Sequence, residues 1–245
     1  MKEWLTGRNP VFEALQARRR HFFNLLVQQD VRIEGRLKDS VEFARQYKLP
    51  VRMANKQQLS QIDRNHQGIA LEASSYPYSA LEDLVKHSQA QDEAPFFLLL
   101  DLIQDPQNLG SLLRTAELMH VHGVIIPSSQ AAQVTPSVVN ASSGATEHLL
   151  IAQYNLVQAI ERLKQLDLWV YGLDADEKRA KTPDKLLLKG GLALVVGNEG
   201  EGLRSLVRKN CDEIMCLPQY GKIDSLNAAV AGSIALYLAR QARTN

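Results

Sequence analysis

Three polar loops carry the residue types that could bind and orient a small molecule. Each follows a short apolar run and is followed by a helical pattern, and they span residues 105–110, 197–203 and 217–227. In open α/β sheets, loops at the carboxyl ends of strands are where ligands bind. Two neighbouring strand–loop–helix units in the last quarter of the chain therefore predict a ligand site there.

The loop at 197–203 differs from the familiar nucleotide signatures. Its glycines follow the order G-x-x-G-x-G, the reverse of the dinucleotide order, and no G-K-[ST] follows them. This excludes a Rossmann oxidoreductase and a P-loop enzyme. Glycines alone are also compatible with an ordinary turn between a strand and a helix. In the third loop, Ser225 or Asp224 could cap a helix that begins near Leu226, and Asn227 would then be an unremarkable first-turn residue.

The elements that position these loops form an apolar α/β pattern. Apolar strands flanked by helices imply a parallel sheet covered on both faces. The expected strands are residues 96–100, 123–126, 149–152, 169–173, 192–196 and 214–217. The expected helices are residues 109–120, 135–143, 156–166, 203–209 and 226–240.

The first part of the chain shows a smaller α/β pattern. Strands are expected at 22–27, 51–53 and 68–73, with helices beginning at Pro10 and covering 41–47 and 57–62. From residue 74 the composition shifts to Ser, Pro, Gln, Asp and Glu around one short helix at 81–86. We therefore expect a small α/β domain over 1–73, a linker over 74–94 and a second domain over 95–245.

Composition and charge limit the class of protein. The 245 residues are 45% hydrophobic and 22% charged, which is typical of a globular chain, and no apolar run reaches membrane-spanning length. The start of the chain lacks the apolar core of a signal peptide, and two unpaired-looking cysteines, Cys211 and Cys216, suit a reducing cytosol. Residues 1–75 hold 13 Lys and Arg against 8 Asp and Glu, a net of +5, whereas the remainder is −4. A basic module joined to a mildly acidic one is a weak indication of nucleic-acid binding.

The expected final helix is apolar around almost its whole circumference. Such a helix is buried, either in a core or partly against another subunit. Burial against another subunit would mean that the protein dimerises, whereas burial in the core of one chain is the simpler interpretation.

Taken together, the three loops resemble a known enzyme family. The segments Asp105–Gly110 with Arg114-Thr115-Ala116, Gly197–Leu203, and Leu217-Pro218 through Ser225-Leu226-Asn227 closely resemble the motifs of the SpoU (TrmH) class of RNA ribose 2′-O-methyltransferases, within the SPOUT superfamily. Ser143-Gly144-Ala145 also matches a family motif. The third motif departs slightly, because family members often carry Ile-Pro-Met and Leu-Asn-Val-Ser where this chain has Leu217-Pro218-Gln219 and Leu226-Asn227-Ala228-Ala229.

The resemblance extends to the N-terminal part. Residues 7–11 and 66–70 are similar to the small RNA-binding domain of the branch that methylates a guanosine ribose in bacterial large-subunit rRNA. The implied substrate is therefore 23S rRNA. A tRNA ribose methyltransferase is one alternative, although the minimal tRNA enzymes of the family lack such a domain. A non-catalytic RNA-binding protein that keeps the fold is the other.

The resemblance also implies a fold, a cofactor and site residues. The fold is a parallel sheet with a deep trefoil knot, in a homodimeric cytoplasmic enzyme that needs no metal. S-adenosylmethionine is expected to bind at Gly197, Leu217 and Leu226, one position in each knot loop. Arg114 is expected to activate the ribose hydroxyl by electrostatics, because an arginine is an implausible free base. The residues expected to hold Arg114 and the ribose in place are Asn108, Glu199, Ser225 and Asn227.

Overall fold

The computed structural model describes residues 1–174, 180–200, 202–223 and 225–244. Its internal contacts divide the chain into two compact units. Unit 1 consists of residues 1–77 and 134–148, and unit 2 of residues 78–133 and 149–245. The predicted Asp224 cap and Glu201 of the second loop lie outside the described residues.

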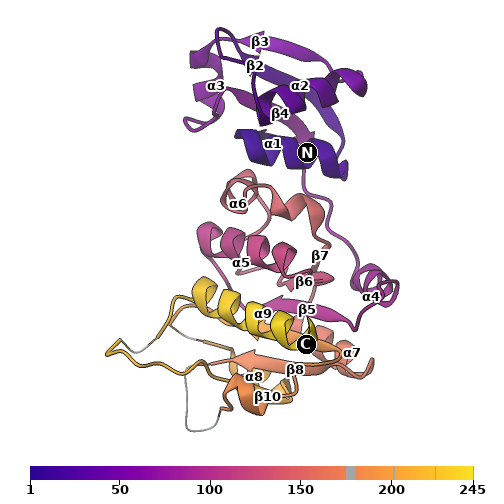
Figure 1. Cartoon of the computed structure of the whole chain (residues 1–245), viewed down its shortest axis with the longest axis vertical. Coiled ribbons are helices and arrows are strands. Elements are labelled where there is room, and N and C mark those ends of the chain that lie inside the picture. The colour runs from indigo at the N-terminus through magenta and orange to yellow at the C-terminus, as the bar shows by residue number, and fades with distance from the viewer. Residues whose placement is uncertain (175–179, 201, 224, 245) are drawn as a thin grey trace. The chain divides into compact units, whose positions relative to one another are not determined.

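Unit 1 is a four-stranded sheet with helices packed on it (Figure 1). Its strands are β1 (Lys2–Thr6), β2 (Phe22–Gln28), β3 (Val51–Ala54) and β4 (Ile69–Ser74). Its helices are α1 (Arg8–Ala17), α2 (Arg36–Gln46), α3 (Lys56–Ile62), α6 (Pro136–Ala141) and the 3₁₀ helix η1 (Ala145–His148). The predicted small α/β fold is present, and strand β1 was not predicted.

The missed strand β1 is held by its neighbour. It pairs antiparallel with β4, from Lys2 opposite Ser74 to Thr6 opposite Ala70, in a sheet of order β1-β4-β2-β3. Only Leu5 and Thr6 of the five residues are buried, so the segment lacks the alternation of buried and exposed residues that predicts a strand. Long-range pairing therefore decided this element.

Residues 134–148 belong to unit 1 by their internal contacts, and the predicted domain bounds of 1–73, 74–94 and 95–245 stay a prediction. A buried ion pair accounts for the place of residues 134–148 in unit 1. The guanidinium of Arg20 donates to both carboxylate oxygens of Glu147, across 2.7 and 2.8 Å, and both side chains are almost fully buried. Two buried opposite charges must stay paired, because removing one partner costs about 3–5 kcal/mol. No local pattern announces a partner 127 residues away.

Unit 2 contains a six-stranded sheet of order β10-β8-β9-β5-β6-β7 (Figure 1). Every recorded pairing in it is parallel, which confirms the predicted parallel sheet. The strands are β5 (Phe96–Leu100), β6 (Gly123–Ile126), β7 (Ile151–Gln153), β8 (Trp169–Leu173), β9 (Leu192–Val196) and β10 (Glu213–Met215). The helices are α4 (Leu81–Gln89), α5 (Pro106–Leu118), α7 (Leu156–Lys164), the 3₁₀ helix η2 (Pro183–Lys185), α8 (Ser205–Asn210) and α9 (Ala228–Thr244). The trefoil knot stays a prediction.

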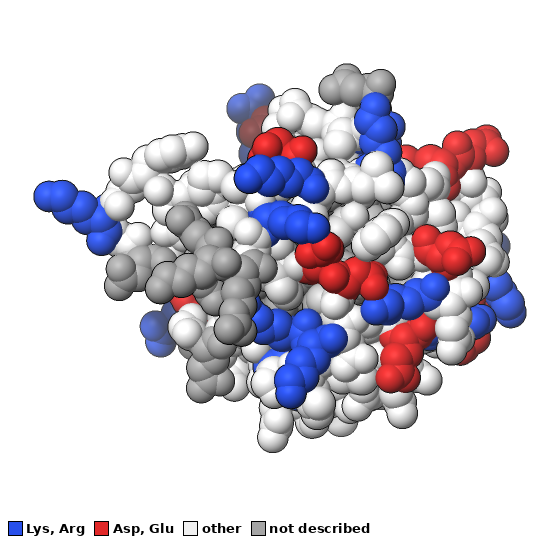
Figure 2. All heavy atoms as spheres, turned by 90° about the horizontal axis from the view of Figure 1, so that it is seen from below, with Lys and Arg blue, Asp and Glu red and all other residues white. Residues whose placement is uncertain are grey.

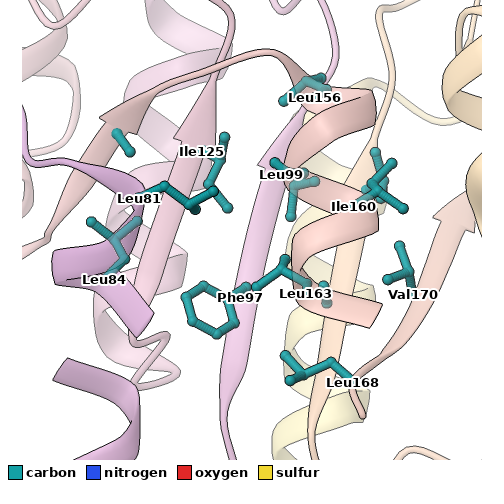
Figure 3. Close-up of a cluster of buried hydrophobic side chains, with 14 of the residues drawn as sticks. Leu81, Leu84, Phe97, Leu99, Ile125, Leu156, Ile160, Leu163, Leu168 and Val170 are labelled. Carbon is teal, nitrogen blue, oxygen red and sulfur yellow. The ribbon is translucent and has the colours of Figure 1, made fainter. Parts of the chain in front are cut away.

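Helices cover both faces of this sheet. Alternate residues of β5 point to opposite faces, and Phe97 and Leu99 join the core formed with α4, α7 and α8 (Figure 3). Helices α5 and α9 pack together, with Gly232 of α9 close to Val196 of β9. The expected linker is thus partly structural: Leu81 and Leu84 of α4 lie in the core of unit 2, and each buried leucine contributes about 1.5–3 kcal/mol.

The surface carries both signs of charge. Figure 2 shows a face on which Lys and Arg side chains are interspersed with Asp and Glu. Among the described helices, none is long and apolar enough to cross a membrane.

Candidate active site

The three polar loops follow strands β5, β9 and β10. Strands β5 and β9 are hydrogen-bonded neighbours in the centre of the sheet, with Leu100 opposite Val196. Chain order reverses here, because β6 and β7 extend the sheet on one side of β5 and β8 extends it beyond β9. A reversal of this kind opens a crevice at the carboxyl ends of the strands, where ligands bind. The first two loops therefore start side by side.

The loop after β9 folds tightly back on itself. The backbone groups of Asn198 and Gly202 exchange two hydrogen bonds, of 3.1 and 3.0 Å. A Cβ on Gly197 would lie 2.3 Å from the carbonyl carbon of Gly202, so there is no room for a side chain at position 197. Gly197, predicted as a cofactor residue, is thus required for the close backbone approach that shapes the loop.

A buried carboxylate fixes the far end of the same loop. Asp101, at the end of β5, is 1% exposed. It accepts from the backbone N–H of Arg204 across 2.9 Å and from its Nε across 2.7 Å. Charge-assisted bonds of this type are the stronger ones in proteins. Asp101 therefore anchors the loop after β9 to the central strand β5.

Asn108 lies in the first turn of α5. Asp105 caps this helix, since its carboxylate accepts from the N–H groups of Gln107 and Asn108, both across 3.2 Å. Proline at the first helical position suits that cap. The helix begins three residues before the predicted Leu109, and Asn108 consequently lies close to the strand end.

Asn227 caps helix α9. Its Oδ1 accepts from the backbone N–H of Ala229 across 2.9 Å and of Val230 across 3.3 Å. The alternative that Ser225 caps this helix, with Asn227 a residue of no special meaning, is therefore wrong. The helix begins at Ala228, two residues later than predicted. The sequence could not decide which residue caps the helix, and hence where the helix begins, because Ser, Asp and Asn are all favoured at the N-cap.

Three side chains from the three loops form one hydrogen-bonded cluster. Asn227 Nδ2 donates to Glu199 Oε2 across 2.8 Å and to Asn108 Oδ1 across 3.1 Å. Asn108 Nδ2 donates to the same Glu199 oxygen across 3.3 Å. The amide group of Asn227 thus uses its oxygen for the helix and its nitrogen for the site. Each loop is held relative to the other two.

Close packing of α5 and α9 brings the two asparagines together. A Cβ on Gly232 would lie 2.5 Å from Leu112 of α5 and 3.1 Å from Val196 of β9. The hydroxyls of Thr115 and Ser233 lie 2.9 Å apart and join the same two helices. Because Gly232 has no side chain, α9 can approach closely enough for Asn227 to reach Asn108.

A cavity of about 200 Å³ opens beside this cluster. Its walls include all three residues predicted for the cofactor, Gly197, Leu217 and Leu226, together with Glu199 and Ser225. Leu217 is half-buried and Leu226 and Ser225 are exposed, so the cavity is reachable from solvent.

One carboxylate in this cavity was not among the predicted site residues. Asp174 lines it and forms an ion pair with Arg208 of α8. It comes directly after Leu173, at the carboxyl end of β8. A polar residue at the end of a predicted strand is the signal that could have found it.

Arg114 lies further along α5, with an exposed side chain. Six residues of helix separate it from Asn108, about 9 Å along the axis. The structure therefore places Arg114 on the same rigid helix as Asn108, one residue before the Thr115 contact with α9. Its action on the substrate stays a prediction.

One further cluster resembles a metal site by composition. Glu93, His120 and His122 offer ligand atoms within 4.8 Å of one another. However, His122 Nδ1 accepts from the N–H of Phe96 across 3.0 Å, which assigns the proton of the neutral ring to Nε2, facing Glu93 Oε1 at 3.1 Å. A protonated nitrogen has no lone pair for a metal. Arg240 of α9 also pairs with Glu93, so the cluster reads as a salt bridge that holds α9.

Comparison with known proteins identifies this architecture. Residues 95–237 match the model of the SpoU rRNA Methylase family, and residues 4–79 match RNA 2′-O ribose methyltransferase substrate binding. The chain belongs to the SpoU methylase family. As a member, it is an RNA 2′-O-methyltransferase.

Relatives and solved structures of the SpoU methylase family match both units. The chain is 36% identical over 239 residues to the TrmH-family protein YacO of Bacillus subtilis, covering 96% of this chain and 94% of YacO. It is 34% identical over 245 residues to the 23S rRNA (guanosine-2′-O-)-methyltransferase RlmB of Xylella fastidiosa, covering 99% and 97%. The AdoMet-bound rRNA methyltransferase from Sinorhizobium meliloti has the same fold, with a TM-score of 0.80 at 24% identity over 98% of this chain and 87% of that one.

Proposed function

We propose that this SpoU methylase transfers a methyl group from S-adenosylmethionine to the ribose 2′-hydroxyl of a guanosine in bacterial 23S rRNA. The observation that carries the choice of substrate is the end-to-end match of both units to a relative named for that reaction. A match confined to unit 2 would leave the RNA class open. Unit 1 is then the part that recognises the rRNA, and unit 2 the part that performs the transfer.

The cavity beside Glu199 suits the cofactor. Its walls combine a glycine that permits close backbone approach, Gly197, with the apolar side chains of Leu217 and Leu226. The carboxylates of Asp174 and Glu199 line the same cavity, and negative groups favour a cationic ligand in a partly desolvated site. When bound, S-adenosylmethionine supplies an electrophilic methyl group on its sulfonium.

The hydrogen-bonded cluster positions the substrate side of the site. A ribose 2′-hydroxyl is a poor nucleophile near neutral pH and must lie in line with the group it attacks, and positioning of this kind can contribute several kcal/mol. Asn108, Glu199 and Asn227 hold one another from three loops. Ser225, which lines the same cavity, completes the polar side of the site. These residues keep the loops in a single arrangement before RNA binds.

Arg114 is the residue that acts on the reacting oxygen. As the 2′-hydroxyl loses its proton, negative charge develops on the oxygen, and a guanidinium stabilises that charge without itself giving up a proton. The adjacent RNA phosphate, which the same fork of N–H groups can bind, is oriented by this contact. The proton leaves toward the RNA phosphate or solvent, and the methyl group takes its place on the oxygen.

A homodimer in the cytoplasm completes the proposal. Helix α9 exposes three apolar side chains at helical spacing, Val230, Ile234 and Tyr237, with 47%, 39% and 51% of each accessible. An exposed apolar stripe on a helix whose other face is buried is typical of a subunit interface. The site at the start of α9 then lies on the same helix as the contact between copies.

Mapping ribose methylation in a strain that lacks the gene tests the function. We expect one 2′-O-methylguanosine to disappear from 23S rRNA and to return when the wild-type gene, but not the Arg114→Ala variant, is supplied. Loss of a methyl group from tRNA instead would assign the tRNA alternative. An unchanged methylation map would favour the non-catalytic RNA-binding alternative.

A further inference from the structure

Unit 1 contains a second cavity, of about 310 Å³, that the methyl-transfer chemistry does not use. It lies where the carboxyl ends of α1 and α2 meet the start of β2. Its apolar residues include Leu15, Ala44 and Leu49. We call this the Tyr47 pocket, after the aromatic residue on its wall. An apolar cavity with polar groups at its mouth is the usual form of a small-ligand site.

The wall of the Tyr47 pocket pairs an aromatic ring with a guanidinium. Arg18 Cζ lies 3.6 Å from the ring centroid of Tyr47, and Phe43 stacks against the same tyrosine at 6.1 Å and 18°. Tyr47 nevertheless stays 42% exposed. Phe43 therefore holds the ring from within the unit, and the Arg18–Tyr47 pair offers flat, polarisable surface of the sort on which bases stack.

Basic groups surround the opening. Arg18, His21 and Lys48 all line the Tyr47 pocket and are all exposed. Within the described part of the chain, neither Arg18 nor Lys48 forms an ion pair, and the residues described as lining the pocket include no carboxylate. Arg20 also lines it, but the carboxylates of Glu3 and Glu147 compensate its charge. The uncompensated charge at the opening is positive.

The basic residues Arg18 and Lys48 lie at the carboxyl ends of α1 and α2, but the helix ends do not explain where the side chain of Arg18 points. Basic side chains near a helix carboxyl end are favoured by the helix dipole. That effect alone would direct Arg18 to the last carbonyls of α1, whereas its guanidinium lies over Tyr47, the residue that follows α2. Arg18 and Lys48 adopt left-handed backbone angles, φ 53° and 56°, which turn the chain at both helix ends. Both turns bring a basic residue to the same opening.

We propose that the Tyr47 pocket binds one unpaired nucleotide of the substrate RNA, distinct from the nucleotide that is methylated. The base lies against the apolar floor and the Arg18–Tyr47 wall, and the adjoining phosphate contacts Lys48 and His21. This inference rests on the proposed role of unit 1 in RNA recognition. A single-stranded segment is the required form, because a base inside a duplex cannot leave its stack without cost.

Two variants separate stacking from charge in the full-length protein. Tyr47→Ala should weaken binding of a single-stranded oligoribonucleotide about tenfold, with an unchanged dependence on salt, and Tyr47→Phe should bind within about twofold of wild type. Lys48→Gln should lower the slope of log affinity against log salt by about 0.7, the value for one phosphate on single strands. Arg32→Gln, at an exposed ion pair with Glu34 and outside the residues that line the pocket, is the matched control and should bind as wild type. Saturating S-adenosylhomocysteine keeps nucleotides out of the cofactor cavity during these measurements.

Photo-crosslinking locates the contact independently of affinity. An oligoribonucleotide with one 4-thiouridine should crosslink to peptides that contain residues 15–22 or 47–50, and a duplex of the same sequence should not. Crosslinks confined to other parts of unit 1, or wild-type affinity in a folded Tyr47→Ala protein, would overturn the proposal. If Tyr47→Ala does not fold, Arg18→Gln at the exposed end of α1 tests the same wall, with the same expected loss. Methyl transfer by the wild-type protein is measured in parallel: its absence would contradict the proposed function, whereas an active wild type whose RNA affinity does not change in Tyr47→Ala would contradict only the pocket.

Discussion

Asn227 and Glu199 are joined by a 2.8 Å hydrogen bond while the other end of the Asn227 amide caps helix α9. One side chain thus links the start of the last helix to the loop after the central strand. Its Oδ1 accepts from the first backbone N–H groups of α9, and its Nδ2 donates to the carboxylate of Glu199. The two contacts therefore use different atoms of the amide. Asn227 therefore contributes to the stability of the helix and to the geometry of the site, and different substitutions can separate the two contributions.

Replacing Asn227 with aspartate should separate them. Aspartate keeps an oxygen for the cap, so the free energy of unfolding should change little, but it cannot donate to Glu199 and places two carboxylates together. We expect a loss of methyl-transfer rate of at least tenfold with a near-normal melting temperature. Asn227→Ala should lose the same activity and about 1 kcal/mol of stability as well. Equal melting temperatures for the alanine and aspartate variants would show that the cap contributes nothing.

Arg114→Ala should reduce the rate of methyl transfer by a factor of about 10²–10³, the typical cost of removing one group that stabilises developing charge. S-adenosylmethionine affinity, measured by calorimetry, should not change. Because the side chain is exposed, stability should move by no more than about 0.5 kcal/mol. Arg114→Lys keeps the charge and loses the planar fork, so it should recover only part of the rate. Normal turnover in a folded, RNA-binding Arg114→Ala protein would refute the assigned role.

Gly197→Ala should disrupt cofactor binding. Its Cβ would lie 2.3 Å from the backbone of Gly202, and relief of such overpacking typically costs about 1–3 kcal/mol. The loop must open, and S-adenosylmethionine affinity should fall steeply in calorimetry. Gly221→Ala is the control, because nothing lies within 4 Å of a Cβ at that position. Similar cofactor affinity in the two variants would contradict the role given to Gly197.

Glu93→Gln should destabilise unit 2 in a pH-dependent way. Burial acts to raise the pKa of Glu93, but hydrogen bonds from Arg240, His120 and His122 outweigh it and lower the pKa to about 2. The carboxylate therefore stabilises the fold above its usual pKa of 4.5, and this contribution is lost as pH falls from there towards 2. We expect Glu93→Gln to cost about 1–3 kcal/mol at neutral pH.

The difference between wild type and Glu93→Gln should shrink in urea titrations as pH falls below 4.5. The exposed Glu161→Gln on α7 is the matched control and should show no comparable cost. The free energy of unfolding of the wild-type protein itself should also fall as pH drops below 6.5, because burial lowers the pKa of His122 and protonation of its ring favours the unfolded chain. A difference between Glu93→Gln and wild type that grows as pH falls from 4.5 towards 2 would have the wrong sign for this account.

Ile234→Asp should produce monomers. The wild-type chain should sediment at about twice its 27.4 kDa mass, because Val230, Ile234 and Tyr237 leave apolar area on α9 to be covered. A charge in the middle of that stripe should prevent association without unfolding the helix, since Ile234 is exposed within one chain. A wild-type protein that sediments as an active monomer would rule out the dimer.

The local sequence determined most of the elements and the places where chemistry is concentrated. Apolar runs such as 96–100 and 192–196 form the central strands. A strand that is buried on both faces is a continuous apolar run, so it can be predicted from the sequence without knowing which strands pair with it. Polar residues directly after those runs marked the loops of the site. The family motifs singled out Asn108, Glu199 and Asn227 together, and their spacing along the chain said nothing of the hydrogen bonds between them.

Only the tertiary structure decided the features that depend on distant pairs. Strand β1 forms because it pairs with β4. Residues 134–148 belong to unit 1, where Glu147 forms a buried ion pair with Arg20. Helix α4 belongs to unit 2, where Leu81 and Leu84 are buried in the core. The choice of Asn227 over Ser225 as the cap of α9 belongs to the same class. Each of these is a contact between groups far apart in sequence, or a choice among locally equivalent residues, so the free energy that selects it appears only once the chain has packed.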